Sequence, residues 1–214
     1  MKITDACVYP YPAGDSTPAR MAFEARDLGF DSIIAVGAGV RPSPGAEVLR
    51  GAVIGAASIK DVLKQVRDPA VRRADVVSVN ARDIAFNRAV VSLKEIRVVR
   101  GIHATQRNAF DHVAARSAAE HGVAVDISLA PLIQLRGTRR QRALQRYADI
   151  LTLQRRYGFP LTISSDARSI LEQRPVRDVQ GLCGLFGMTG TEVSEALASV
   201  GRLVTPDSPV KVVR

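Results

Sequence analysis

Several residue types are scarce in this sequence, and each scarcity disfavours a class of protein. There are two cysteines, Cys7 and Cys183, with 176 positions between their numbers and no Cys-x-x-Cys pair. A disulfide framework and a zinc site of clustered cysteines and histidines are therefore disfavoured. Because both cysteines have apolar neighbours, we expect two buried thiols.

Long apolar runs are also missing. None approaches the roughly 20 residues that a membrane-spanning helix needs. The N-terminal segment is too short in its apolar part for a signal peptide, and it contains Asp5. We therefore expect a cytoplasmic protein that has no membrane partner.

Aromatic residues make up 5% of the chain and tryptophan is absent, so base stacking is not expected as the main mode of any nucleic-acid binding. Acidic residues are outnumbered 21 to 30 by lysine and arginine, which gives a net charge of +9. The lysines are Lys2, Lys60, Lys64, Lys94 and Lys211, so the other 25 basic residues are arginines. The planar guanidinium suits phosphate. Charge alone leaves two interpretations open, a polyanionic partner or a merely basic surface.

Short β-branched runs alternate with helical patterns along the whole chain. We predict strands at 4–9, 32–36, 48–56, 75–79, 96–99, 123–129 and 161–165. We predict helices at 19–28, 58–66, 81–89, 110–121, 139–157, 176–186 and 189–200.

Near-continuous apolar strands separated by helices indicate a parallel sheet covered on both faces. Seven such strands predict an α/β fold, namely a single-domain (β/α) TIM-like barrel over residues 1–214, with a loose tail at 205–214. The turn Arg41–Gly45 is expected to lie inside the domain, because a boundary there would leave too small a first piece. An open, doubly wound sheet is the alternative.

Catalytic groups are sparse at the predicted carboxyl ends of the strands, where barrel enzymes place their chemistry. A metal-dependent phosphoesterase would have to use Asp5, Asp83, His103 and Asp166 as ligands. A small-molecule enzyme could use Ser164 or Ser165 as a nucleophile, but no matching base is evident. The favoured interpretation is an enzyme scaffold with no catalytic residue and no metal site.

The richest basic stretch runs from Arg136 to Arg156. At about 100° per residue, Arg139, Arg142 and Arg146 form one stripe, which we expect to face solvent. Arg136 and Arg140 lie at the start of the same helix, where positive charge opposes the helix dipole unless an anion binds. We therefore predict phosphate contacts here, although a solvated arginine face would have the same pattern.

A second basic group follows the strand at 161–165. Short hydroxyls next to arginines are a plausible set of phosphate contacts. The predicted RNA-binding residues of this group are Ser164, Ser165, Arg168, Arg174 and Arg177, and Arg100, Arg107 and Arg116 add charge nearby. Recognition of the shape and backbone of a structured RNA fits these side chains better than reading of single-stranded bases.

The second half of the chain resembles a known family. Residues 110–129, FDHVAARSAAEHGVAVDISL, are similar to the central motif of ribonuclease P protein component 3, the archaeal counterpart of the eukaryotic thirty-kilodalton RNase P/MRP subunit. The similarity continues through Arg139 and Arg140, through PLTISSDARS at 160–169 and RPVRD at 174–178, to Gly187-Met188-Thr189. It covers about residues 100–200, and the first hundred residues carry no comparable signature.

The resemblance implies a barrel related to the polymerase and histidinol phosphatase fold but without its metal site. It also implies a subunit of RNase P, the endoribonuclease that removes the 5′ leader from precursor tRNA. The catalytic RNA would perform the cleavage with magnesium, and this chain would bind no cofactor. Implied partners are the RNase P RNA, protein component 2 in a heterodimer or heterotetramer, the other RNase P proteins and, indirectly, precursor tRNA.

Asp166 departs from the family pattern, because it occupies a position expected to be uncharged. It could orient Arg168 or cap a helix, and it weakens the expected attraction of phosphate there. The sequence has no long basic C-terminal tail, which favours the archaeal form over the eukaryotic one.

Overall fold

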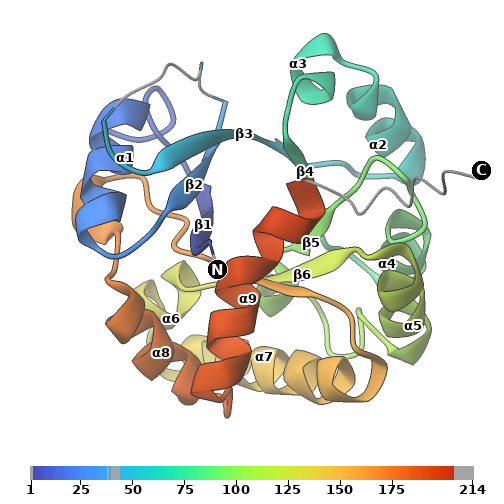
Figure 1. Ribbon diagram of the computed structural model, residues 1–214. Coiled ribbons are helices and arrows are strands. Elements are labelled where there is room, and N and C mark those ends of the chain that lie inside the picture. Colours follow the sequence, from blue (N-terminus) through green and yellow to red (C-terminus); the bar gives the residue numbers. More distant parts are fainter. Residues whose placement is uncertain (1, 38, 40–43, 205–214) are drawn as a thin grey trace, which may run out of the picture.

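The computed structural model describes residues 2–37, 39 and 44–204. Within them, seven strands form one parallel sheet in which neighbours follow chain order (Figure 1). The strands are β1 (Thr4–Val8), β2 (Ser32–Val36), β3 (Glu47–Ile54), β4 (Val76–Asn80), β5 (Val98–Arg100), β6 (Ala124–Ser128) and β7 (Leu161–Ser164). Val8 also forms a parallel bridge with Ala167, just beyond β7. The last strand thus returns to the first, and the sheet is a nearly closed barrel.

This strand order confirms the predicted barrel and excludes the open, doubly wound sheet. In a doubly wound sheet the order reverses at a switch point, whereas here it does not. Each connection between neighbouring parallel strands crosses over with the same hand, so every strand is added on the same side of the one before it. Repeating this step brings β7 next to β1.

Helices surround the strands in the described part of the chain (Figure 1). They are α1 (Pro18–Asp27), α2 (Ile59–Val66), α3 (Pro69–Arg72), α4 (Ile84–Val90), α5 (His112–His121), α6 (Ala130–Gln134), α7 (Gly137–Tyr157), α8 (Val176–Gly184) and α9 (Gly190–Val204), with 3₁₀ turns η1 (Ile102–Ala104) and η2 (Ile170–Glu172). Each predicted helix is present with shifted ends. The short α3 and α6 were not predicted, because four or five residues cannot display a helical period.

Local capping chemistry sets the helix ends that the sequence predicted. The Thr17 and Ser58 hydroxyls accept hydrogen bonds from backbone amides in the first turns of α1 and α2. At α9 the predicted capping box is present, since the Thr189 amide donates to Glu192 and the Glu192 amide donates to the Thr189 hydroxyl. Gly158 ends α7 in the left-handed conformation.

The connection from β2 to β3 has no helix in its described residues. The predicted turn Arg41–Gly45 falls partly, and the predicted tail 205–214 wholly, outside the described residues. Helix α1 packs against both β2 and β3. In β3, Gly51 allows close packing, because a Cβ there would lie 2.5 Å from Cγ2 of Ile34.

The barrel interior has an apolar layer and a polar layer. At the amino ends of the strands, small and branched residues contact α9, which crosses this end of the barrel in Figure 1. These residues are Ala6, Ile34, Val76, Val98 and Ala124, and α9 contributes Val200 and Leu203. The polar layer lies at the carboxyl ends of the strands. Burial of both cysteines confirms the two predicted thiols.

The structure bears on the expectation that no helix crosses a membrane. Over the described ranges, every helix is too short or too polar to cross a bilayer.

Candidate functional site

A buried arginine is the centre of the polar layer. Arg100, the last residue of β5, is only 3% exposed. Its guanidinium is 3.0 Å from Oδ2 of Asp126 and also pairs with Asp166. It donates a further hydrogen bond of 3.2 Å to the hydroxyl of Ser164. Arg100 therefore pairs with two carboxylates inside the barrel, and its burial disfavours its predicted role as an RNA contact.

Strand β1 and the residue after it supply further partners for Arg100. The guanidinium lies 2.7 Å from the sulfur of Cys7 and 3.1 Å from the hydroxyl of Tyr9. Burial by itself lowers the pKa of Arg100, but the charges of Cys7, Asp126 and other nearby groups outweigh it and hold the pKa well above its usual value. Burial raises the pKa of Asp126 despite the opposing Arg100. A buried ion pair of this kind is stable only while both charges are present, because a single buried charge without a partner strongly destabilises the folded state.

The four residues proposed as metal ligands do not converge. Asp5 accepts hydrogen bonds from the amides of Cys7 and Ser165, and Asp83 caps α4 through the amide of Phe86. His103 contacts Tyr147, and Asp166 pairs with Arg100. Over the described ranges, no three His, Cys, Asp or Glu residues gather closely enough to hold a metal ion. The geometry thus does not favour the metal-dependent phosphoesterase.

The two serines at the end of β7 form hydrogen bonds inside the barrel. Ser164 is fully buried, and its hydroxyl donates to Asp126 over 2.7 Å. Ser165 is 7% exposed, and its hydroxyl accepts from the amide of Ala167. Because both side chains are buried and hydrogen-bonded inside the barrel, the structure disfavours both predicted RNA contacts. A serine nucleophile is equally disfavoured, since the Ser164 hydroxyl is fully buried and donates to Asp126, a carboxylate that is itself paired with Arg100.

Asp166 has a structural role that the sequence did not reveal. It adopts a left-handed backbone conformation with φ of 55°, which turns its carboxylate toward the barrel. There it pairs with Arg100 and accepts a hydrogen bond of 2.5 Å from Ser128. It neither orients Arg168 nor caps a helix, contrary to the two expectations. Arg168 instead donates to the carbonyl of Ala13.

The remaining predicted arginines lie at the surface. Arg107, Arg116, Arg136, Arg139, Arg168 and Arg177 are exposed, and Arg140 and Arg174 are partly buried. Most belong to α7 and to the segments that follow β5 and β7, so the carboxyl ends of these strands bring them to one end of the barrel. Arg116 is separate, on α5, where it pairs with Glu120 one turn later.

The arginines after β7 are partly engaged by the chain. Arg168 lies over the ring of Tyr9, with 4.8 Å between the guanidinium carbon and the ring centroid. Arg174 donates to the carbonyls of Leu171 and Gln173. Arg177 has a 90% exposed side chain, 3.7 Å from Asp178. These contacts hold the guanidinium groups of Arg168 and Arg174 against the protein, and Asp178 partly offsets the charge of Arg177.

Two arginines of the predicted α7 stripe, Arg139 and Arg142, are exposed as expected, and Arg146 is partly buried. The segment after β5 packs against the helix, and together they enclose a hollow of about 550 Å³, the α7 cleft. The α7 cleft is lined by His103, Ala104, Thr105, Gln106, Leu135, Arg139, Arg142 and Arg146. Nε of Arg146 donates to the carbonyl of Thr105 over 3.3 Å. This contact immobilises one side of the stripe against the loop.

The named RNA contacts predicted from the sequence do not include Arg142, Arg146 or His103. The spacing of 139, 142 and 146 nevertheless already placed the three arginines on one face of the helix. What the sequence did not reveal was the loop that lies beside this face. Burial lowers the pKa of His103, so the imidazole is neutral at neutral pH.

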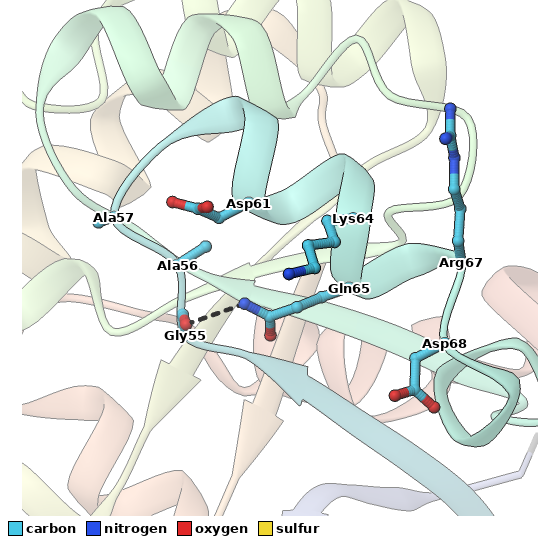
Figure 2. A pocket seen from close by; sticks show the side chains of 8 residues that line it. All are labelled: Gly55, Ala56, Ala57, Asp61, Lys64, Gln65, Arg67 and Asp68. Carbon is cyan, nitrogen blue, oxygen red and sulfur yellow. Dashed lines mark hydrogen bonds between the residues drawn. The ribbon is translucent and has the colours of Figure 1, made fainter.

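A second hollow shows why the α7 cleft is the better candidate. A hollow of about 560 Å³ lies beside α2. Figure 2 shows the residues that line it, among which Gln65 donates to the carbonyl of Gly55. Its charged side chains are Asp61, Lys64, Arg67 and Asp68. Two acids balance two bases there, so this hollow does not concentrate positive charge.

Known structures support the fold. An archaeal ribonuclease P solved by cryo-electron microscopy with mature tRNA contains a chain that superposes with a TM-score of 0.72 at 17% identity, covering 94% of this chain and 89% of that one. A histidinol phosphate phosphatase from Lactococcus lactis, complexed with zinc, L-histidinol and phosphate, gives a TM-score of 0.59 at 12% identity, covering 87% and 94%. At these identities the likeness concerns the fold.

Sequence comparisons supply the family. Residues 2–208 match the family described as RNase P subunit p30. Ribonuclease P protein component 3 of Methanothermobacter thermautotrophicus is 34% identical over 163 residues, which cover 76% of this chain and 66% of that protein. The protein of the same name from Methanococcoides burtonii is 28% identical over 217 residues, covering 98% and 86%. The match includes the first hundred residues, where no motif was evident, and the chain belongs to the RNase P subunit p30 family.

Proposed function

We propose that this chain is a protein subunit of RNase P that binds the catalytic RNA and supports removal of the 5′ leader from precursor tRNA. Membership of the RNase P subunit p30 family over residues 2–208 carries the proposal. The surface arginines at the carboxyl end of the barrel support it, because they offer guanidinium groups to phosphates.

The RNA contacts in this proposal are Arg107, Arg136, Arg139, Arg140, Arg168, Arg174 and Arg177, with Arg116 as an outlying member. Arg136 and Arg139 lie at the start of α7, where no side chain caps the free backbone amides of the helix. Uncapped amides and guanidinium groups both favour a bound phosphate. Neutralised phosphates would let the RNA hold a compact, active shape.

In the proposed assembly the RNA performs hydrolysis with its own magnesium, and this chain supplies no nucleophile and no cofactor site. Its expected protein partners are component 2, in a heterodimer or heterotetramer, and the other RNase P proteins. This chain would be cytoplasmic and would interact with precursor tRNA only indirectly, through the rest of the assembly. Support comes from the interior, where Arg100 already occupies the carboxylates of Asp126 and Asp166.

Single-turnover cleavage of precursor tRNA tests the proposal. The RNase P RNA is assayed with magnesium, alone, with component 2, and with component 2 plus this chain; this chain alone with magnesium is a further arm. We expect faster cleavage only when the RNA and both proteins are present. Cleavage by the chain alone would contradict the proposal, and so would a rate unaffected by its addition.

A further inference from the structure

The α7 cleft concentrates positive charge that the protein does not itself neutralise. Three arginines line the cleft. Within the described part of the chain, Arg146 is the only one of the three that forms an ion pair, at 3.7 Å from Asp149. Arg139 and Arg142 are exposed and make no ion pair with any described residue. Because Arg146 is held by the carbonyl of Thr105, the cleft has one fixed cation and two available ones.

A histidine in the same cleft has a defined proton position. The hydroxyl of Tyr147 donates to the carbonyl of Ser128 over 2.9 Å, so its single proton is used. Nδ1 of His103 lies 3.2 Å from that hydroxyl oxygen and must therefore be the donor. In the neutral ring, Nε2 is then an acceptor, and it has no hydrogen-bond partner among the residues that the structure describes.

These groups match one unit of RNA backbone. A phosphate alone needs far less room than about 550 Å³, a size in the range of sites that hold a small molecule such as a nucleotide. Guanidinium groups bind the phosphate, but an unprotonated nitrogen requires a donor. The ribose 2′-hydroxyl is such a donor, it accompanies every RNA phosphate, and DNA lacks it.

We propose that the α7 cleft binds one ribonucleotide of RNA, with its phosphate on Arg139 and Arg142 and its 2′-hydroxyl donating to Nε2 of His103. This inference rests on the proposed function and adds a point at which the protein distinguishes RNA from DNA. Recognition through phosphate and ribose is independent of base identity, which agrees with the scarcity of aromatic side chains.

Replacing the 2′-hydroxyl tests the histidine contact. The full chain is titrated with RNase P RNA and with the same transcript carrying 2′-fluoro riboses, which remove the donor with little added bulk. We expect the wild-type chain to bind the fluorinated RNA about three- to ten-fold more weakly. His103→Phe should bind both RNAs with nearly equal affinity. A preference that survives in His103→Phe overturns the proposal.

The phosphate contact has its own matched pair of variants on one helix. Arg142→Ala should weaken binding of both transcripts about ten-fold at low salt and flatten the salt dependence by nearly one phosphate. Arg156→Ala, in the last turn of α7 where the guanidinium lies over Tyr157, should change neither. Equal effects of the two substitutions would overturn the assignment of the phosphate to the cleft.

A direct readout covers the case in which His103→Phe disturbs the fold. The ¹⁵N resonances of the His103 ring are followed while the wild-type chain is titrated with the dinucleotide ApA or its 2′-deoxy form. We expect Nε2 to respond to ApA and much less to the deoxy form. Equal responses, or a response to a short polyglutamate peptide instead, would overturn the proposal. Failure of the proposed function is distinguishable, because RNase P RNA would then not bind the wild-type chain at all.

Discussion

Arg100 inside the barrel and Arg142 on α7 carry the same side chain in opposite electrostatic surroundings. Arg100 is 3% exposed and faces two carboxylates. Arg142 is exposed in a cleft with two other arginines and has no acidic partner among the described residues. The difference teaches that the buried guanidinium is paired with acidic side chains and contributes to folding, whereas the guanidinium groups of Arg139 and Arg142 in the α7 cleft have no acidic partner among the described residues and are available to an anion.

The sharpest way to break this comparison is to remove the inner cation. Arg100→Met keeps much of the side-chain volume but leaves Asp126 and Asp166 without their partner. We expect a loss of about 3–5 kcal/mol in the free energy of unfolding, measured by urea denaturation. Arg139→Met, the surface control, should change it by less than about 0.5 kcal/mol. Similar losses in the two variants would contradict the contrast.

The converse experiment removes outer cations. The triple replacement of Arg136, Arg139 and Arg142 by Ala should weaken binding of RNase P RNA by about 100-fold at low salt and flatten its salt dependence by about two phosphates. Filter binding at several salt concentrations measures both effects. The fold should be retained, because exposed substitutions cost little. A control triple at Arg26, Arg67 and Arg156 should have much smaller effects, and equal effects would show that only net charge matters.

Asp5 differs from the two carboxylates that face Arg100. It is a buried carboxylate without a cationic partner among the described residues. Burial raises its pKa to about 7. The unfolded chain loses this proton near pH 4, so the folded state loses stability as pH rises from about 4 to about 7.

Asp5→Asn removes that dependence. At pH 8 the variant should be more stable than the wild type by about 4 kcal/mol, which corresponds to a melting temperature about 8–16 °C higher, and near pH 4 the two should be alike. Calorimetry across this range measures the difference. A gap that does not widen with pH would show that Asp5 is ionised in the folded protein.

The smallest effect belongs to a surface ion pair. Arg155 donates to Glu192 over 2.7 Å and lowers the pKa of this carboxyl to about 2. The resulting stability is present above about pH 4.5 and is lost as pH falls toward 2. Glu192→Gln should cost up to about 1 kcal/mol at pH 7 and much less at pH 2.5, measured by urea denaturation. The control Glu195→Gln, on the same helix and without an ion pair among the described residues, should cost less at pH 7.

Local sequence signals predicted the elements well because their causes are local. Strand 32–36 was predicted with its observed bounds, and α7 begins two residues before its predicted start. Caps such as Thr17 and the Thr189–Glu192 box depend on residues three positions apart. The sites were less predictable, since Arg100, Ser164 and Ser165 look like surface phosphate ligands until the barrel closes around them.

The sequence by itself determined the alternation of seven strands with helices, the family motifs in the second half and the excess of arginine, because periodicity, capping and composition are written along the chain. Only the tertiary structure decided which arginines are internal. Burial depends on which strands become neighbours, and strand closure places Arg100 between carboxylates that are 26 and 66 positions away. The packing of the η1 segment on α7 likewise forms a cleft beside the predicted stripe, in which Arg139 and Arg142 remain exposed.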